Sequence, residues 1–202
     1  MALTKTQVIN NGLALIKANL IADPSEASES ARNANRIYEQ TVQSELEAHA
    51  WYFAKVQASL PAALIPPVYK FSFAYPVPSD FLRLVELEDK WVFSDIRLPD
   101  TAPDPLYEMQ GRSILTGLSA PLNITYIADV TASTQLWAAS FSDVVSAALA
   151  CDLAMPLTAA SGMVELAQKE YEKAVRAAKH ANAIQMPPQL MADSSWMSVR
   201  AL

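Results

Sequence analysis

Residues 66–83 read PPVYKFSFAYPVPSDFLR, and within them the apolar pattern of the chain changes from helical to β. Four aromatic residues alternate with smaller or polar ones: Tyr69, Phe71, Phe73 and Tyr75. A period of two is typical of a strand with one apolar face. The stretch therefore predicts a β segment inside an otherwise helical chain.

Further short strands are expected after this segment, separated by turns at Gly111 and Gly117. The candidate ranges are 83–88, 91–94, 107–110, 112–116 and 122–128. Residues 66–130 are therefore predicted to be a β insertion between helices.

The chain before the insertion has helical periodicity. Thr4 and Gln7 have the spacing of a capping box, which predicts a first helix over residues 5–21. Asp23, followed by a proline and then Glu26, predicts the start of a second helix. An apolar stripe continues to Leu60, and about 36 residues of helix would be roughly 54 Å long. A helix of this length predicts a spine that also contacts neighbouring subunits.

The chain after the insertion predicts two more helices. Ser140 and Asp143 have capping-box spacing, and the third helix is expected to end at Pro156. A fourth is expected from near Thr158 to Pro187. The predicted class is α+β, mainly α: a long antiparallel helical bundle with a small β-rich insertion and an extended C-terminal tail. Its parts are an N-terminal helical hairpin (1–65), the β insertion (66–130), a C-terminal helical hairpin (131–186) and a docking tail (187–202).

The tail is too apolar for a free chain end. Tryptophan and arginine are enriched among residues that anchor protein interfaces. We therefore predict that four tail residues contact the portal or an adjacent subunit: Trp196, Met197, Val199 and Arg200. The alternative, in which the tail folds back on its own helices, is open at this point.

Charge and composition exclude several classes of protein. A formal charge of −6 and a pI near 4.9 argue against tight wrapping of nucleic acid, which needs clustered basic residues. Cys151 is the only cysteine, so an intrachain disulfide and a cysteine-based zinc site are excluded, and a buried, inert thiol is expected. No transmembrane helix or signal peptide is predicted, which favours a cytoplasmic site of synthesis.

No catalytic, cofactor-binding or metal-binding residue is predicted. Glu45 and His49 are four residues apart and could place two metal ligands on one helix face, but the Glu-x-x-His motif of di-iron bundles is absent. An interhelical hydrogen bond is the preferred interpretation of His49. His180 is expected near a helix C-terminus. The sequence also lacks glycine-rich phosphate loops and nucleophile elbows.

Several fragments, in this order, resemble a known family. Trp51-Tyr52-Phe53-Ala54 precedes a strand that ends at Tyr75 and continues through Pro78, Asp80 and Arg83. The later fragments are residues 122–126, 149–158, Tyr171 with Ala174, and the ending with Trp196 and Arg200. The chain is similar to the head-to-tail adaptor, or tail tubular protein A, family of short-tailed bacteriophages. The resemblance implies a structural role for six motif residues: Trp51, Phe53, Tyr75, Pro78, Asp80 and Arg83.

The resemblance implies a non-enzymatic virion protein without a cofactor. It predicts a homo-oligomeric ring, commonly of twelve copies, between the portal protein and the tail nozzle protein. Tail fibres are a further candidate partner, and double-stranded DNA would pass through the lumen without sequence-specific binding. The expected location is the virion tail, and the host cytoplasm during assembly. A small helical metal-binding enzyme and a virion assembly scaffold are the alternatives.

Overall fold

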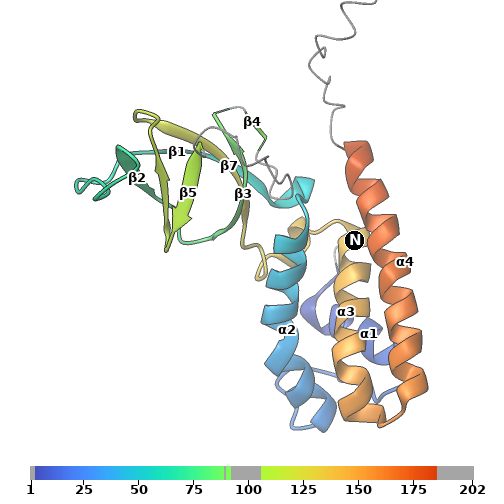
Figure 1. Cartoon of the computed structure of the whole chain (residues 1–202). Coiled ribbons are helices and arrows are strands. Elements are labelled where there is room, and N and C mark those ends of the chain that lie inside the picture. Colours follow the sequence, from blue (N-terminus) through green and yellow to red (C-terminus); the bar gives the residue numbers. More distant parts are fainter. Residues whose placement is uncertain (1–2, 89, 92–105, 186–202) are drawn as a thin grey trace, which may run out of the picture.

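The computed structural model describes residues 3–88, 90–91 and 106–185, which form a helical module and a smaller β module (Figure 1). The helices are α1 (Lys5–Leu15), α2 (Glu29–Ala48), α3 (Ala139–Thr158) and α4 (Ser161–Gln185), with two short 3-10 helices, η1 (Tyr52–Ala54) and η2 (Thr134–Leu136). The strands are β1 (Lys55–Leu60), β2 (Phe73–Pro76), β3 (Phe81–Leu87), β4 (Lys90–Trp91), β5 (Tyr107–Gln110), β6 (Ser113–Thr116) and β7 (Leu122–Ala128).

The chain is α+β, but the predicted long helical bundle is wrong. Of the residues that the structure describes, 49% are helical and 19% are in strands. The helix predicted to continue to Leu60 ends at Ala48, and His49 is already extended, with φ −147° and ψ 154°. Residues 55–60 form β1 instead, paired antiparallel with β7. Phe53, Val56 and Leu60 had the spacing of a helical stripe, but cross-strand pairing decides the conformation of this segment.

The start of the chain combines one confirmed cap with two shifted helix ends. The Thr4 hydroxyl accepts a hydrogen bond from the Gln7 backbone N–H at 3.3 Å, and the Gln7 side chain accepts one from the Thr4 N–H. The helix ends at Leu15 rather than at residue 21, and the Asn10 side chain bonds both backbone groups of Ile21. The N-cap of α2 is Ser28. Asp23, the predicted N-cap, only stabilises a local turn, in which its carboxylate accepts a hydrogen bond from the Ser25 N–H.

α3 is the central helix of the helical module and contacts α1, α2 and α4. By length and composition it could cross a membrane, but 61% of its apolar window is buried, as in the core helix of a folded module. Its predicted capping box is absent, since the N-cap is Ala138 without a side-chain bond. Pro156 lies inside the helix rather than ending it.

The β module consists of two small antiparallel sheets. One has the strand order β1-β7-β3-β4, and the other has the order β2-β6-β5. Four of the predicted ranges agree closely with β3, β5, β6 and β7, whereas the range 91–94 lies mostly outside the described residues. The aromatic strand is shorter than predicted, because only Phe73–Pro76 pairs with β6. Residues 64–71 are a loop, in which Lys70 has a positive φ of 72°.

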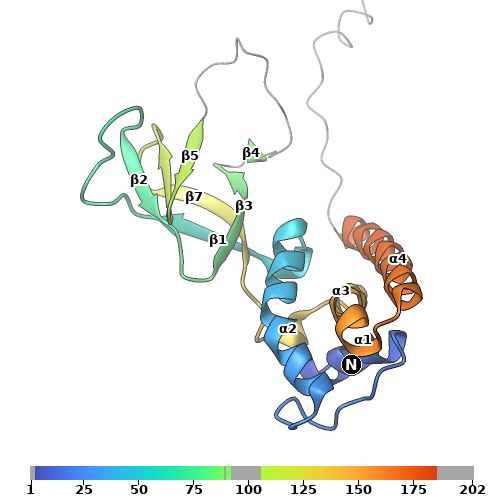
Figure 2. The ribbon, with the colours of Figure 1, turned by 60° about the horizontal axis from the view of Figure 1, so that its bottom comes forward.

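One sheet forms a wall shared by two apolar cores. Leu84 and Tyr126 point into the core of the β module, together with Tyr75. Val85 and Ile127, from the same strands β3 and β7, belong to the core of the helical module. Alternate residues of a strand lie on opposite faces, which explains this division. Figure 2 shows the β module beside the C-terminal end of α2.

Candidate functional site

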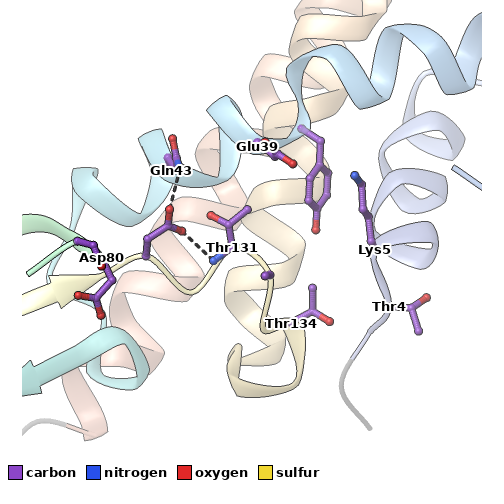
Figure 3. A pocket seen from close by; sticks show the side chains of 11 residues that line it. Thr4, Lys5, Glu39, Gln43, Asp80, Thr131 and Thr134 are labelled. Atoms are coloured by element: carbon purple, nitrogen blue, oxygen red, sulfur yellow. Dashed lines mark hydrogen bonds between the residues drawn. The ribbon is translucent and has the colours of Figure 1, made fainter. Parts of the chain in front are cut away.

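A pocket of about 680 Å³ lies where the helical module meets the β module. It is formed by the start of α1, the middle of α2, the turn before β3 and the loop after β7 (Figure 3). The residues that line it are mostly polar: Thr4, Lys5, Tyr38, Glu39, Gln43, Ser79, Asp80, Asp129, Thr131, Ala132 and Thr134. We call it the junction pocket.

Asp129 connects the two modules at this pocket. Its carboxylate accepts hydrogen bonds from the Gln43 side chain of α2 at 2.7 Å and from the Thr131 backbone N–H at 3.0 Å (Figure 3). Its own N–H donates to the carbonyl of Asp80 at 2.7 Å. Burial alone would raise the pKa of Asp129, but the hydrogen bonds from Thr131 and Gln43 outweigh burial and lower it.

Two motif residues form hydrogen bonds near the same pocket, one within the β module and one across the junction. The Asp80 carboxylate accepts a hydrogen bond from the Tyr126 hydroxyl, at 3.1 Å to the nearer oxygen. Burial and the Asp80 charge together raise the pKa of Tyr126. The Arg83 guanidinium donates to the carbonyl of Glu47, near the end of α2, at 3.0 Å. The structural role that the resemblance implies for both motif residues stays a prediction.

One hydroxyl group lies buried at the pocket without a partner among the described residues. It belongs to Tyr38, which is 2% exposed. Burial raises the pKa of Tyr38 to about 12, so this phenol is a neutral donor. The Lys5 ammonium lies 4.6 Å from the centre of the Tyr38 ring. Buried hydroxyls usually have a partner, so the pocket can hold ordered water or one polar group.

Of the other motif residues, three belong to the two cores or pack against them, and Pro78 lies outside both. Trp51 packs edge-on against Phe141 at 5.0 Å between ring centroids and stacks on Phe53 at 6.2 Å. The buried Tyr75 donates its hydroxyl hydrogen to the carbonyl of Leu118 at 2.7 Å. The carbonyl of Pro78 accepts a hydrogen bond from Arg112 at 2.6 Å. These four motif residues stabilise the fold, and none lines the junction pocket.

The four residues of the predicted tail interface lie outside the described residues: Trp196, Met197, Val199 and Arg200. Among the described residues, no group of three or more histidine, cysteine, aspartate or glutamate side chains could hold a metal ion.

Glu45 and His49 contact α4 separately. The Glu45 carboxylate accepts a hydrogen bond from the Tyr171 hydroxyl at 2.8 Å, and the His49 ring meets the Asn182 amide at 3.3 Å. The latter contact agrees with the preferred interhelical interpretation. Burial raises the pKa of the Glu45 carboxyl and lowers that of His49. Burial, with the nearby carboxylates, raises the pKa of the half-buried Cys151 thiol to about 11, which disfavours the reactive thiolate.

No sequence pattern pointed to Asn182, although this residue joins α4 to the turn that precedes β1. It is 2% exposed, and its side chain accepts from the Tyr52 N–H at 2.8 Å and donates to the Ala50 carbonyl at 3.0 Å. Gln43, Tyr38 and Asp129 were missed as well. None of them forms part of a sequence motif, so only the folded chain brings them together.

The chain matches no protein-family model, and no curated protein matches it. The resemblance to head-to-tail adaptors therefore stays a prediction.

Asp129→Asn is expected to make the free energy of unfolding fall less steeply as the pH drops into the acid range. Because the folded-state pKa of Asp129 is lowered, its ionised form favours the folded state above the unfolded pKa of about 4. This contribution is lost as the pH falls through the folded-state pKa. Urea unfolding at pH 7, 5, 4 and 3 should show the largest difference between wild type and variant at pH 7, and a shrinking difference below pH 4.

Glu39→Gln is the matched control, because it removes an exposed carboxylate from the same pocket. We expect this control to keep the wild-type pH profile. Parallel profiles for Asp129→Asn and wild type would contradict the assigned role of Asp129.

Proposed function

We propose that this chain is a structural subunit of a head-to-tail adaptor ring in a short-tailed bacteriophage. It would lie between portal and tail nozzle as a conduit for genomic DNA. The order of sequence fragments suggested this family. The single structural observation that carries the proposal furthest is an exposed apolar loop at the tip of the β module.

This loop connects β1 to β2 and leaves four large apolar side chains in solvent. Leu64 is 102% exposed, Ile65 is 82%, Val68 is 98% and Tyr69 is 81%. Single exposed apolar residues are common on soluble proteins, whereas a contiguous group usually marks a surface that binds a partner. An assembly subunit needs such a surface.

The junction between the modules supports the same proposal. Side chains of α2 bond to the loops around the sheet, and the helical core includes residues of β3 and β7. A subunit built in this way holds its two modules at a fixed angle. Fixed geometry is required of a ring subunit, because each contact must repeat with the same rotation for the ring to close.

The acidic composition is compatible with a DNA conduit. With a formal charge of −6, the chain has little attraction for phosphates, and a negative lumen wall repels the polymer that moves past it. Homo-oligomer contacts, the portal and the nozzle are the proposed partners, and tail fibres are a further candidate. The location would be the virion tail, after synthesis in the host cytoplasm.

The test is to mix the purified chain with the portal protein encoded by the same genome and to image the product by electron microscopy. We expect rings bound coaxially to the portal, even if the isolated chain is monomeric. A chain that stays monomeric and never joins the portal would overturn the proposal. Immunogold labelling of mature particles separates the alternatives, because an adaptor labels the tail vertex whereas an assembly scaffold is absent.

A further inference from the structure

We propose that the exposed loop of one copy binds a groove on the helical module of the next copy. The tip loop is residues 61–72, between β1 and β2. The helical groove lies between α1, α3 and α4. This inference rests on the proposed function, since it names the contact that would join neighbouring subunits of the ring.

The tip loop is held in shape although its apolar side chains are exposed. At its base, the Ala63 N–H donates to the Ala74 carbonyl at 2.7 Å. Near the other end, the Lys70 ammonium bonds the Glu108 carboxylate of β5 at 2.6 Å. Pro66 and Pro67 restrict the backbone between these two points. A loop that is already ordered loses less conformational entropy on binding.

The helical groove is open, and half of the residues that line it are apolar. Its volume is about 560 Å³, enough for several aliphatic side chains. Small residues of three helices make it hollow: Ala14 of α1, Ala147 of α3, and Ala174 and Ala177 of α4. Leu15 adds an aliphatic wall, and charged residues occur at Asp143, Glu170 and Lys173. Small side chains leave space that larger apolar side chains can fill.

The loop and the groove lie at opposite ends of the molecule. In Figures 1 and 2 the β1–β2 connection is at the far end of the β module, away from α1, α3 and α4. The loop therefore cannot reach the groove of its own chain, but it can reach the groove of a second copy. Such a contact is heterologous, and heterologous contacts generate rings when the rotation between copies closes.

Charge favours a second copy over a lipid surface as the occupant. Membrane-surface segments use clusters of four to eight basic residues. Lys70 is the single basic residue in residues 61–72, and it is paired with Glu108. The loop therefore offers apolar area without the charge cluster that an anionic membrane selects.

The size of the contact explains how assembly would be controlled. Four side chains offer roughly half of the approximately 800 Å² per partner that a standard interface buries. One such contact does not hold a stable dimer. In a closed ring each copy makes the contact twice, once through its loop and once through its groove, so the ring is favoured over open pairs.

Disulfide trapping in the full chain tests the proposal. The background is Cys151→Ser, which removes the native thiol. Val68→Cys places a thiol on the loop, and Ala177→Cys places one in the groove. Under mild oxidation, the double variant should give a ladder of covalent oligomers. An equimolar mixture of the two single variants should give mainly one mixed dimer.

The control carries Leu20→Cys in place of Val68→Cys. Leu20 is exposed but lies outside both the tip loop and the helical groove. The control should give at least tenfold less crosslinked product with Ala177→Cys. Equal yields from control and test pairs would overturn the proposal. So would a Val68→Cys variant that crosslinks mainly with itself, since this indicates a loop-to-loop contact. Co-flotation with phosphatidylglycerol vesicles is a further test. If the wild type floats with the vesicles and Val68→Ser does not, the loop binds lipid and the proposal is overturned.

The outcomes separate this inference from the proposed function. Rings on the portal without loop-to-groove crosslinks would leave the adaptor function intact and reject the contact. Crosslinked ladders from a protein that never binds the portal would support the contact and reject the adaptor function.

Discussion

Replacing Trp51 by alanine is expected to lower the free energy of unfolding by about 3–5 kcal/mol, the usual cost of truncating a buried tryptophan. Trp51 is 2% exposed and packs against Phe53 and Phe141. Its indole N–H donates to the Glu45 carbonyl at 2.7 Å, so truncation also leaves a buried acceptor without its donor. Urea unfolding followed by circular dichroism measures the change.

Two further variants serve as controls for Trp51→Ala. Trp51→Phe keeps an aromatic ring but removes the indole donor, so its cost should be smaller, with about 1 kcal/mol from the lost hydrogen bond. Leu20→Ala truncates an exposed side chain and should change the stability by less than about 0.5 kcal/mol. A cost for Trp51→Ala no larger than that for Leu20→Ala would show that the aromatic cluster is not a core.

Gly12→Ala is expected to destabilise the protein by about 1–3 kcal/mol, the usual cost of overpacking. Glycine inside a helix is normally less favourable than alanine by roughly 1 kcal/mol, so the sign is reversed here. A Cβ atom at Gly12 would lie 2.7 Å from the backbone carbonyl oxygen of Ser146 in α3. Backbone atoms of a packed helix cannot move aside without separating α1 from α3.

Gly162→Ala is the matched control, because a Cβ atom there meets nothing within 4 Å. Gly162 also lies in a helix, α4, so its replacement should be neutral or stabilising by up to about 1 kcal/mol. Thermal melts of both variants compare the two sites directly. Equal stabilisation by the two substitutions would contradict the close approach of α1 and α3.

Local signals in the sequence predicted parts of the fold well. The Thr4–Gln7 cap requires only neighbouring residues, and it is present. The ranges of β3, β5, β6 and β7 follow from alternation and turn residues, which are also local. The class α+β was predicted correctly for the same reason.

Features that depend on distant partners were not predicted. β1 was assigned to a helix because its pairing with β7 joins residues about 70 positions apart, such as Lys55 and Ile127. Asp23 has the spacing of an N-cap but forms only a turn, and Ser28 caps α2 instead. The junction pocket was missed, since its residues converge from separate elements that carry no shared motif.

The shared wall between the cores has a consequence for how the chain can be divided. Val85 and Ile127 complete the helical core, while Leu84 and Tyr126 of the same strands complete the β core. Excising the β module would leave the helices with an uncovered apolar face, and the excised piece would expose the opposite face of its own sheet. We therefore expect the two modules to unfold together as one cooperative unit, and neither to stay folded when it is moved alone into another protein.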